Sequence, residues 1–202
     1  MQPNIPDRRM APLLDALEET DKASIRRAVE ELVAMAAEEP GVAEALAERL
    51  RTAPRWPVAY ALGQITRPSA PCLEMLVWGL GSGDQDLRWA TQLLLTDLGK
   101  RYPEVGARLE GLLSAGSATQ RRMTVYCLRD IGAEGLEVSL LKAIHDPEPL
   151  VRVAAVTTFA KAAGAGAEVL NALGSAAAAD ADVRVRNAAS FAVKRLSGGG
   201  SS

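Results

Sequence analysis

Apolar residues recur three or four positions apart along most of this chain, as one buried helical face requires. A clear example is the run that contains Leu136, Leu140, Leu141 and Ile144. This spacing predicts a series of helices, each of which forms the first half of a helix pair. They are Pro12–Glu19, Val42–Arg51, Ala70–Leu80, Glu104–Leu113, Leu136–His145 and Ala167–Ala177.

An arginine recurs in a similar setting and marks the start of the second helix of each pair. The positions are Arg26, Arg55, Arg88, Arg121, Arg152 and Arg186, at intervals of 29, 33, 33, 31 and 34 residues. A period of about 20–50 residues is typical of a solenoid, in which each unit buries its apolar face against its neighbours. The pattern therefore predicts one continuous helical core.

Local signals agree with these helix boundaries. Ser117 through Gln120 fits a capping box, and Pro57 falls in a first helical turn, where no backbone donor is lost. Gly99, Gly132 and Gly164 follow second helices and are expected to be their C-terminal caps.

The chain resembles bacterial HEAT-repeat proteins of the phycobilisome-lyase-like type over roughly residues 10–196. The segments that carry the resemblance are Ala61–Ile65, Cys127–Gly132, Val151–Ala155 and Val185–Ala189, with Asp146 and Asp180 in the place of the inter-helix aspartate. The first two units depart most from it. Pro54-Arg55-Trp56-Pro57 replaces a valine-led helix start, and Ser24–Ala37 lacks the Leu-Gly ending.

Repeat and resemblance together predict an all-α, right-handed α-solenoid of about six HEAT-like antiparallel helix pairs. We expect a single solenoid over residues 1–196 and a flexible Gly/Ser tail over residues 197–202. The resemblance is specific for the fold and nearly silent on function, because a fold does not determine what is bound.

Composition limits the classes of partner. The formal net charge is −2, so no global signal favours nucleic acid or a membrane. Residues 1–50 hold 11 acidic and 6 basic side chains, which leaves residues 51–202 with a net charge of +3. Cys72 and Cys127 lie in apolar helical patterns and are expected to be core residues rather than a disulfide or metal ligands. With no membrane span and no secretory signal in the sequence, we expect a cytoplasmic protein.

The repeated arginines allow two interpretations. They could form a positive row for a phosphate backbone, or each could pair with an aspartate or a carbonyl group of the adjacent repeat. A cation in the first turn of a helix is disfavoured by the helix dipole unless it has an acceptor, which favours the structural interpretation. The expected acceptors are Asp84, Asp86, Asp146 and Asp180.

Numbering each second helix from the residue before its arginine places positions three, seven and ten opposite the apolar face. This stripe is expected to line the concave groove of the solenoid. Its aromatic and basic members in repeats two to four are the candidate binding site: Trp56, Tyr60, Trp89, Arg122, Tyr126 and Arg129. The alternative is that these aromatics only complete the core, and Trp78, on a first helix, is expected to do so.

Catalytic chemistry has little support in the sequence. His145 is the one histidine and is expected to cap a helix, and no cofactor or metal site is expected. We predict a non-catalytic scaffold that binds a protein or peptide. One alternative is a HEAT-like DNA-binding protein or alkylpurine DNA glycosylase, with Asp97 or Asp130 as its carboxylate. The absence of a dense basic stripe disfavours nucleic acid. The other alternative, a bilin-lyase-type accessory role, rests on family analogy alone.

Overall fold

The computed structural model describes residues 8–132, 136–161 and 166–198, and within them it contains helices and no strand. The first helices of the pairs are α1 (Met10–Ala16), α3 (Gly41–Thr52), α5 (Ala70–Gly79), α7 (Pro103–Ala115), α9 (Leu136–Ile144) and α11 (Ala167–Ala179). The second helices are α2 (Lys22–Met35), α4 (Trp56–Ile65), α6 (Gln85–Arg101), α8 (Ala118–Ile131), α10 (Pro149–Phe159) and α12 (Val183–Gly198). The predicted helix pairs are confirmed.

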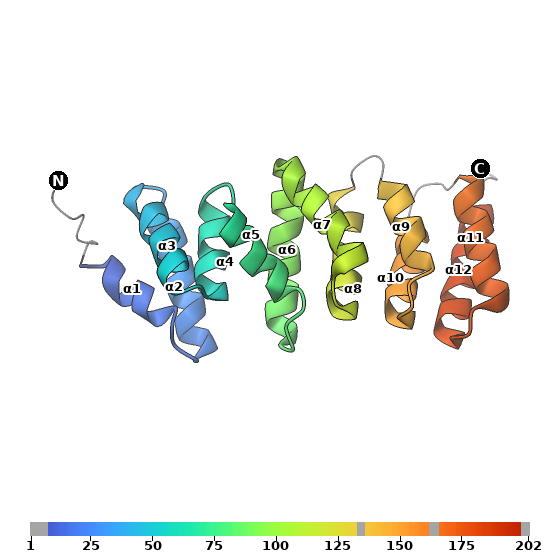
Figure 1. Ribbon diagram of the computed structural model, residues 1–202, viewed down its shortest axis with the longest axis horizontal. Coiled ribbons are helices and arrows are strands. Elements are labelled where there is room, and N and C mark those ends of the chain that lie inside the picture. The colour runs from blue at the N-terminus through green and yellow to red at the C-terminus, as the bar shows by residue number, and fades with distance from the viewer. Residues whose placement is uncertain (1–7, 133–135, 162–165, 199–202) are drawn as a thin grey trace. The chain divides into compact units, whose positions relative to one another are not determined.

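The chain divides into two compact units, residues 1–98 and 99–202, which we call unit 1 and unit 2. In unit 2, α8, α10 and α12 pack in sequence as one layer, and α7, α9 and α11 pack as the other. In unit 1, α2 packs on α4 and α3 packs on α5 in the same manner. Figure 1 shows the helices of each unit standing side by side as pairs. The fold is an all-α helical-repeat solenoid.

The core consists mainly of leucine, valine and alanine from both helices of each pair. Position five is buried in every second helix: Val29, Val58, Thr91, Thr124, Ala155 and Ala189. Position ten, expected on the exposed stripe, is buried at Gly63, Thr96 and Ala160. Position six, which the pattern left out of the core, is buried at Ala59, Gln92, Val125 and Val156. The middle helices therefore bury a wider face than a single apolar stripe, because they have neighbours on both sides.

The helix caps show which local signals are reliable. The Ser117–Gln120 capping box is present, and Gly132 ends α8 in the left-handed conformation at φ 68°, so both predictions are confirmed. The prediction for Gly99 is wrong, because it lies inside α6. A Cβ there would come 2.5 Å from Ile131 Cδ1, so this glycine permits close packing instead. Gly164 lies outside the described residues.

Both cysteines are free and buried, as expected for core residues. None of the described helices is long and apolar enough to cross a lipid bilayer. At the C-terminus α12 continues to Gly198, and the rest of the Gly/Ser tail lies outside the described residues.

Candidate binding groove

The repeated arginine has the same partners in successive repeats of unit 2. Arg121 donates hydrogen bonds from Nε and Nη2 to the two carboxylate oxygens of Asp146, at 2.6 and 2.8 Å. Arg152 donates in the same way to Asp180, at 2.8 Å for both bonds. Each guanidinium thus holds the inter-helix aspartate of the next repeat in a bidentate ion pair. The ion pair with Arg152 lowers the pKa of Asp180.

The arginines also hold the loop of their own repeat. Nη1 of Arg121 donates to the carbonyl oxygen of Gly116 at 2.9 Å, and Nη1 of Arg152 donates to that of Asp146 at 2.8 Å. Arg88 makes the equivalent bond in unit 1, to the carbonyl oxygen of Ser82 at 2.6 Å. Arg121 and Arg152 therefore each join the loop of their own repeat to the aspartate of the next repeat.

Ser82 in unit 1 occupies the place that Asp146 and Asp180 have in unit 2, six residues before the repeated arginine. In all three repeats, the side chain at this place accepts a hydrogen bond from the backbone N–H two residues later, at 3.1, 2.8 and 2.9 Å respectively. The third repeat therefore has no carboxylate at the place that the arginine of the preceding repeat, Arg55, would hold.

Arg55 also lies outside its helix, because α4 lacks its first turn. The other second helices begin three or four residues before their arginine, whereas α4 begins at Trp56, one residue after Arg55. Arg55 has an extended backbone, with φ −137° and ψ 147°. Pro57 in the first turn disfavours helical geometry in the residues before it. In Figure 1 the lower end of α4 accordingly stops short of the lower ends of α2 and α6.

Arg55 and Asp84 each have a partner within unit 1. Nη1 of Arg55 donates to the carbonyl oxygen of Glu18 at 2.7 Å. Asp84 instead pairs with Lys22 at the start of α2, at 2.7 Å, and Lys22 also contacts Asp86 at 3.0 Å. These ion pairs raise the pKa of Lys22 and lower that of Asp84. Lys22 therefore reaches from the first repeat to the third, past the shortened helix.

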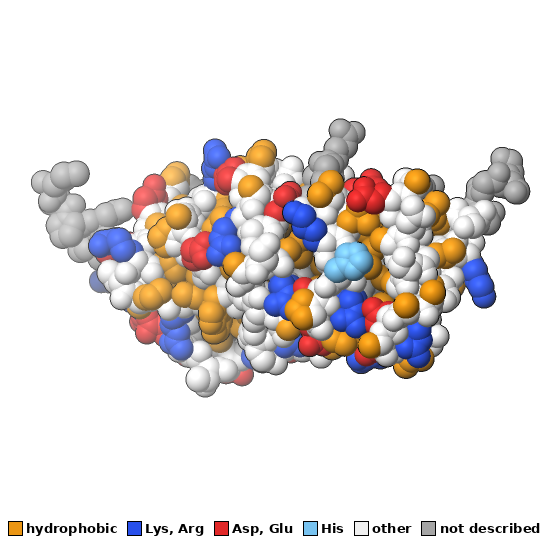
Figure 2. Space-filling model, turned by 45° about the vertical axis from the view of Figure 1, so that its right-hand side comes forward, with side chains coloured by type: hydrophobic (Ala, Val, Ile, Leu, Met, Phe, Trp, Pro, Cys, Tyr) orange, Lys and Arg blue, Asp and Glu red, His pale blue; other side chains and the backbone are white. Residues whose placement is uncertain are grey.

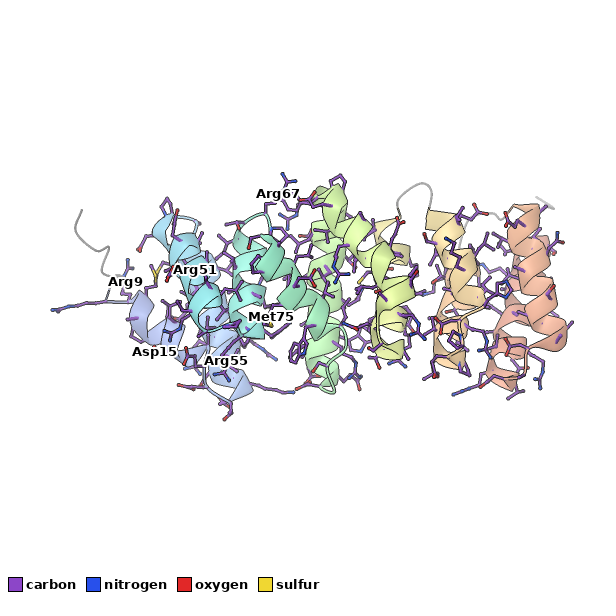
Figure 3. All side chains as sticks on the ribbon, in the orientation of Figure 1. Arg9, Asp15, Arg51, Arg55, Arg67 and Met75 are labelled. Carbon is purple, nitrogen blue, oxygen red and sulfur yellow. The ribbon has the colours of Figure 1, made fainter. Side chains whose placement is uncertain are left out.

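A groove of about 850 Å³ lies beside the shortened helix, entirely within unit 1. Its apolar wall includes Ile25, Trp56, Tyr60, Met75, Trp78 and Leu87. Lys22, Asp84 and Asp86 also line it. Figure 2 shows hydrophobic side chains gathered on the left-hand part of the surface, and Figure 3 labels Arg55 and Met75 near the lower end of α4. The groove thus combines an aromatic wall with a charged rim.

Trp56 and Tyr60 form the rigid part of that wall. Their rings are stacked, with centroids 4.6 Å apart and planes inclined by 26°. The indole Nε1 of Trp56 donates to Thr91 Oγ1 on α6 at 2.9 Å. A Cβ on Gly79 would lie 2.7 Å from this Nε1, so only glycine lets the indole lie here. Burial raises the pKa of Tyr60.

Two of the three tryptophans lie elsewhere than the sequence predicts. Trp56 lines the groove, but Trp89, which is 43% exposed, is not among its lining residues. Trp78 was expected to complete the core, and that prediction is wrong: it is 57% exposed and lines the groove. Two sequence signals pointed to this site: the stripe that contains Trp56 and Tyr60, and the departure of Pro54-Arg55-Trp56-Pro57 from the repeat pattern.

The remaining candidate residues belong to unit 2. The Arg129 guanidinium carbon lies 5.3 Å from the centre of the Tyr126 ring, and the same guanidinium holds both oxygens of Asp130, at 2.6 and 2.9 Å. Arg122 is partly buried. The structure thus brings Trp56 and Tyr60 together in one unit, and Tyr126 and Arg129 in the other.

The described residues offer little for catalysis. Asp97 is exposed on α6, Asp130 is engaged by Arg129, and His145 is exposed just after α9. No group of three possible metal ligands occurs in the part of the chain that the structure describes.

No protein family model matches the chain, and no curated protein matches it. Among solved structures, a designed armadillo repeat protein in complex with the peptide (KR)4 is 17% identical, with 93% of this chain and 99% of that chain covered and a TM-score of 0.48. Two engineered proteins are each 18% identical. One match covers 95% of this chain and 98% of that chain at a TM-score of 0.43, and the other covers 94% and 98% at 0.48. At this identity a structural likeness says nothing of function.

Proposed function

We propose that this protein is a non-catalytic binding module that holds a segment of a protein partner in the groove of unit 1. The observation that carries the proposal is the groove itself, formed where α4 lacks a turn and lined by Trp56, Tyr60 and Trp78. Tryptophan and tyrosine dominate binding energy at protein interfaces, because they offer a large and rigid contact area.

Size and rigidity support this function. A volume of about 850 Å³ lies within the range of sites that enclose small ligands or a few side chains. The wall is ordered before binding, since the Trp56 indole is fixed by Thr91 and by the Tyr60 ring. A pre-ordered wall loses little side-chain entropy when a partner docks.

The experiment is a selection of short random peptides displayed on phage, with the purified protein as bait. Peptides that bind the wild-type protein are then measured against the variants Trp78→Ala and Trp89→Ala. Trp78 lines the groove and Trp89 does not, yet both are substantially exposed tryptophans in helices of the same unit. They are therefore a matched pair.

We expect Trp78→Ala to weaken binding by at least about tenfold, as truncation of an interface tryptophan does. Trp89→Ala should leave binding unchanged, and both variants should melt within a few degrees of the wild-type protein. Binding that depends on Trp89 and not on Trp78, or a selection that yields no binder, would contradict this function.

A further inference from the structure

The turn that α4 lacks indicates the shape of the partner, on the basis of the function proposed above. The residue before each repeated arginine, position one, belongs to the buried face of the second helices. Where neighbouring second helices keep their first turn, this residue is fully buried, as for Val151 and Val185. On either side of the shortened α4, position one is Ile25 in α2 and Leu87 in α6, and both are only half-buried and line the groove. The missing turn thus leaves two residues of the apolar face partly uncovered.

The gap between these two residues has the size of a helical turn. The helix α4 begins one residue after its arginine and the other second helices begin three or four residues before theirs, so four or five residues are missing. They correspond to about 6–7.5 Å of helix, and a helix of that length with its side chains has a volume of about 500–850 Å³. The groove, at about 850 Å³, can hold it.

The start of α4 supplies hydrogen-bond donors for such a turn. Asp21, Ser117 and Glu148 cap the starts of α2, α8 and α10 with their side chains, whereas no side chain caps α4. The first N–H groups of a helix have no acceptor within it, and its last carbonyl groups have no donor. The N–H groups of Trp56 and Val58 are therefore complementary to the C-terminal end of another helix, and the two helix dipoles then align head to tail.

Lys22 is a weak obstacle to a partner. It is the first residue of α2 and pairs with Asp84 and Asp86 beside the start of α6, so it spans the gap at the level where these two helices begin. The side chains of Lys22 and Asp86 are 65% and 83% exposed. Ion pairs this exposed hold their side chains weakly, so a partner can move Lys22 aside.

We propose that the groove of unit 1 binds the C-terminal end of a helix in a protein partner. The last turn of that helix takes the place of the missing first turn of α4. Its apolar side chains cover Ile25 and Leu87 and pack against Trp78, and its terminal carbonyl groups accept hydrogen bonds from the start of α4. The partner thereby completes the row of second helices in unit 1.

The test measures binding of an unlabelled peptide to the full chain by isothermal titration calorimetry. The acetylated and amidated peptide Gly-Glu-Ala-Ala-Ala-Lys-Glu-Ala-Ala-Ala-Lys-Leu-Ala-Leu-Leu is a helix former whose last turn is apolar. In one control peptide two central alanines are D-alanine, which breaks the right-handed helix and keeps the composition. In a second, Leu-Ala-Leu-Leu stands at the N-terminal end instead. We expect each control to bind about tenfold more weakly than the parent peptide.

Two leucines of α6 form a matched pair of protein variants. Leu87 lines the groove, whereas Leu93 is 65% exposed and is not among the lining residues. Leu87→Ala should weaken the parent peptide by about fivefold, because it removes apolar surface that the partner covers. Leu93→Ala should have no effect. Ile25→Ala, on the opposite wall, should act like Leu87→Ala, and thermal melting checks that each variant folds.

The outcomes distinguish the shape of the partner from the function. Equal binding of the parent and D-alanine peptides, both weakened by Leu87→Ala, would show that an extended segment occupies the groove; this would overturn the inference and leave the proposed function. Equal binding of the two helical peptides would overturn docking through the C-terminal end.

Two further results would also overturn the inference. One is binding that Leu87→Ala, Ile25→Ala and Trp78→Ala all leave unchanged, since the helix would then lie outside the groove. The other is failure of the parent peptide to bind. The phage selection decides the function in either case, because it tests Trp78 without assuming a helical partner.

Discussion

At the scale of single residues, the repeated arginine has two different environments, depending on whether a helical turn precedes it. Where the turn is present, as for Arg152, the arginine side chain is 13% exposed and lies between its own loop and Asp180. Where it is absent, Arg55 donates to the Glu18 carbonyl oxygen, and the next repeat carries Ser82 in place of the aspartate. The same residue type therefore holds a carboxylate of the next repeat in one place and only a backbone carbonyl group in another.

We expect Arg152→Ala to lower the free energy of unfolding by about 2 kcal/mol, because it leaves the largely buried Asp180 carboxylate without its partner. The effect should depend on pH. The folded-state pKa of Asp180 lies below its ordinary value of 3.8, so its stabilising contribution is present above that value and is lost as the pH falls through the lowered pKa. Urea unfolding at pH 7 and near pH 2 measures both parts.

Arg184→Ala is the matched control for this substitution, since Arg184 is 58% exposed and pairs with Asp182, two residues away, rather than with the next repeat. It should lower stability much less than Arg152→Ala does. An equal loss in both variants would show that the pair between Arg152 and Asp180 contributes nothing specific.

At the scale of helices, α4 and its neighbours define the groove. The loss of its first turn follows from Pro54 and Pro57, but the aromatic wall also needs close approach between α5 and α6. Gly79 at the end of α5 supplies it, because the Trp56 indole lies over this glycine and reaches Thr91. Helix α4 is thus shortened, and α5 carries a glycine, Gly79, that is small enough for Trp56 to pack over it.

We expect Gly79→Ala to displace Trp56 and to cost about 1–3 kcal/mol, the usual result of overpacking. The indole N–H resonance of Trp56 in a ¹H–¹⁵N spectrum should shift as its hydrogen bond to Thr91 breaks. Gly106→Ala in α7 is the control: a Cβ there meets nothing within 4 Å, so the change should be neutral or stabilising by up to about 1 kcal/mol. Unchanged stability and an unshifted resonance in Gly79→Ala would mean that Trp56 does not rest on this glycine.

The sequence predicts the helices well and the groove poorly, for one physical reason. Aligning second helices on their arginines assumes that each arginine occupies the same helical position, and Arg55 does not. The same alignment placed Trp89 in the candidate site, although Trp89 is not among the residues that line the groove. Trp78, on a first helix, was expected in the core, but it is 57% exposed. Gly99 was predicted to cap a helix, but it permits close packing against Ile131 instead. Both roles require glycine, so the residue type alone does not distinguish them.

At the scale of the whole molecule, the two units differ in charge and in the continuity of their arginine pairs. Unit 2 repeats the Arg–Asp pair without a break from Arg121 to Asp180, whereas unit 1 contains the groove. Because each repeat of a solenoid contacts only its neighbours, stability is set locally along the chain. Binding and structural roles can therefore reside in different parts of one array.

Hydrogen exchange should show this separation. Arg152→Ala should raise the exchange rates of amides in α9 to α12 and leave α2 and α4 near their wild-type rates, and Gly79→Ala should do the reverse. Mass spectrometry of peptic fragments resolves the two regions. Equal acceleration in both units by either variant would show that the chain unfolds as one cooperative body.

The missing turn of α4 also has a consequence for design. One helical turn corresponds to about 5.4 Å of rise. The shortening of α4 is tied to the short stretch Pro54-Arg55-Trp56-Pro57, none of whose residues is fully buried in the core of the repeats. The start of a single helix can therefore be moved, and a groove opened or closed beside it, without a change in the residues that hold the repeats together.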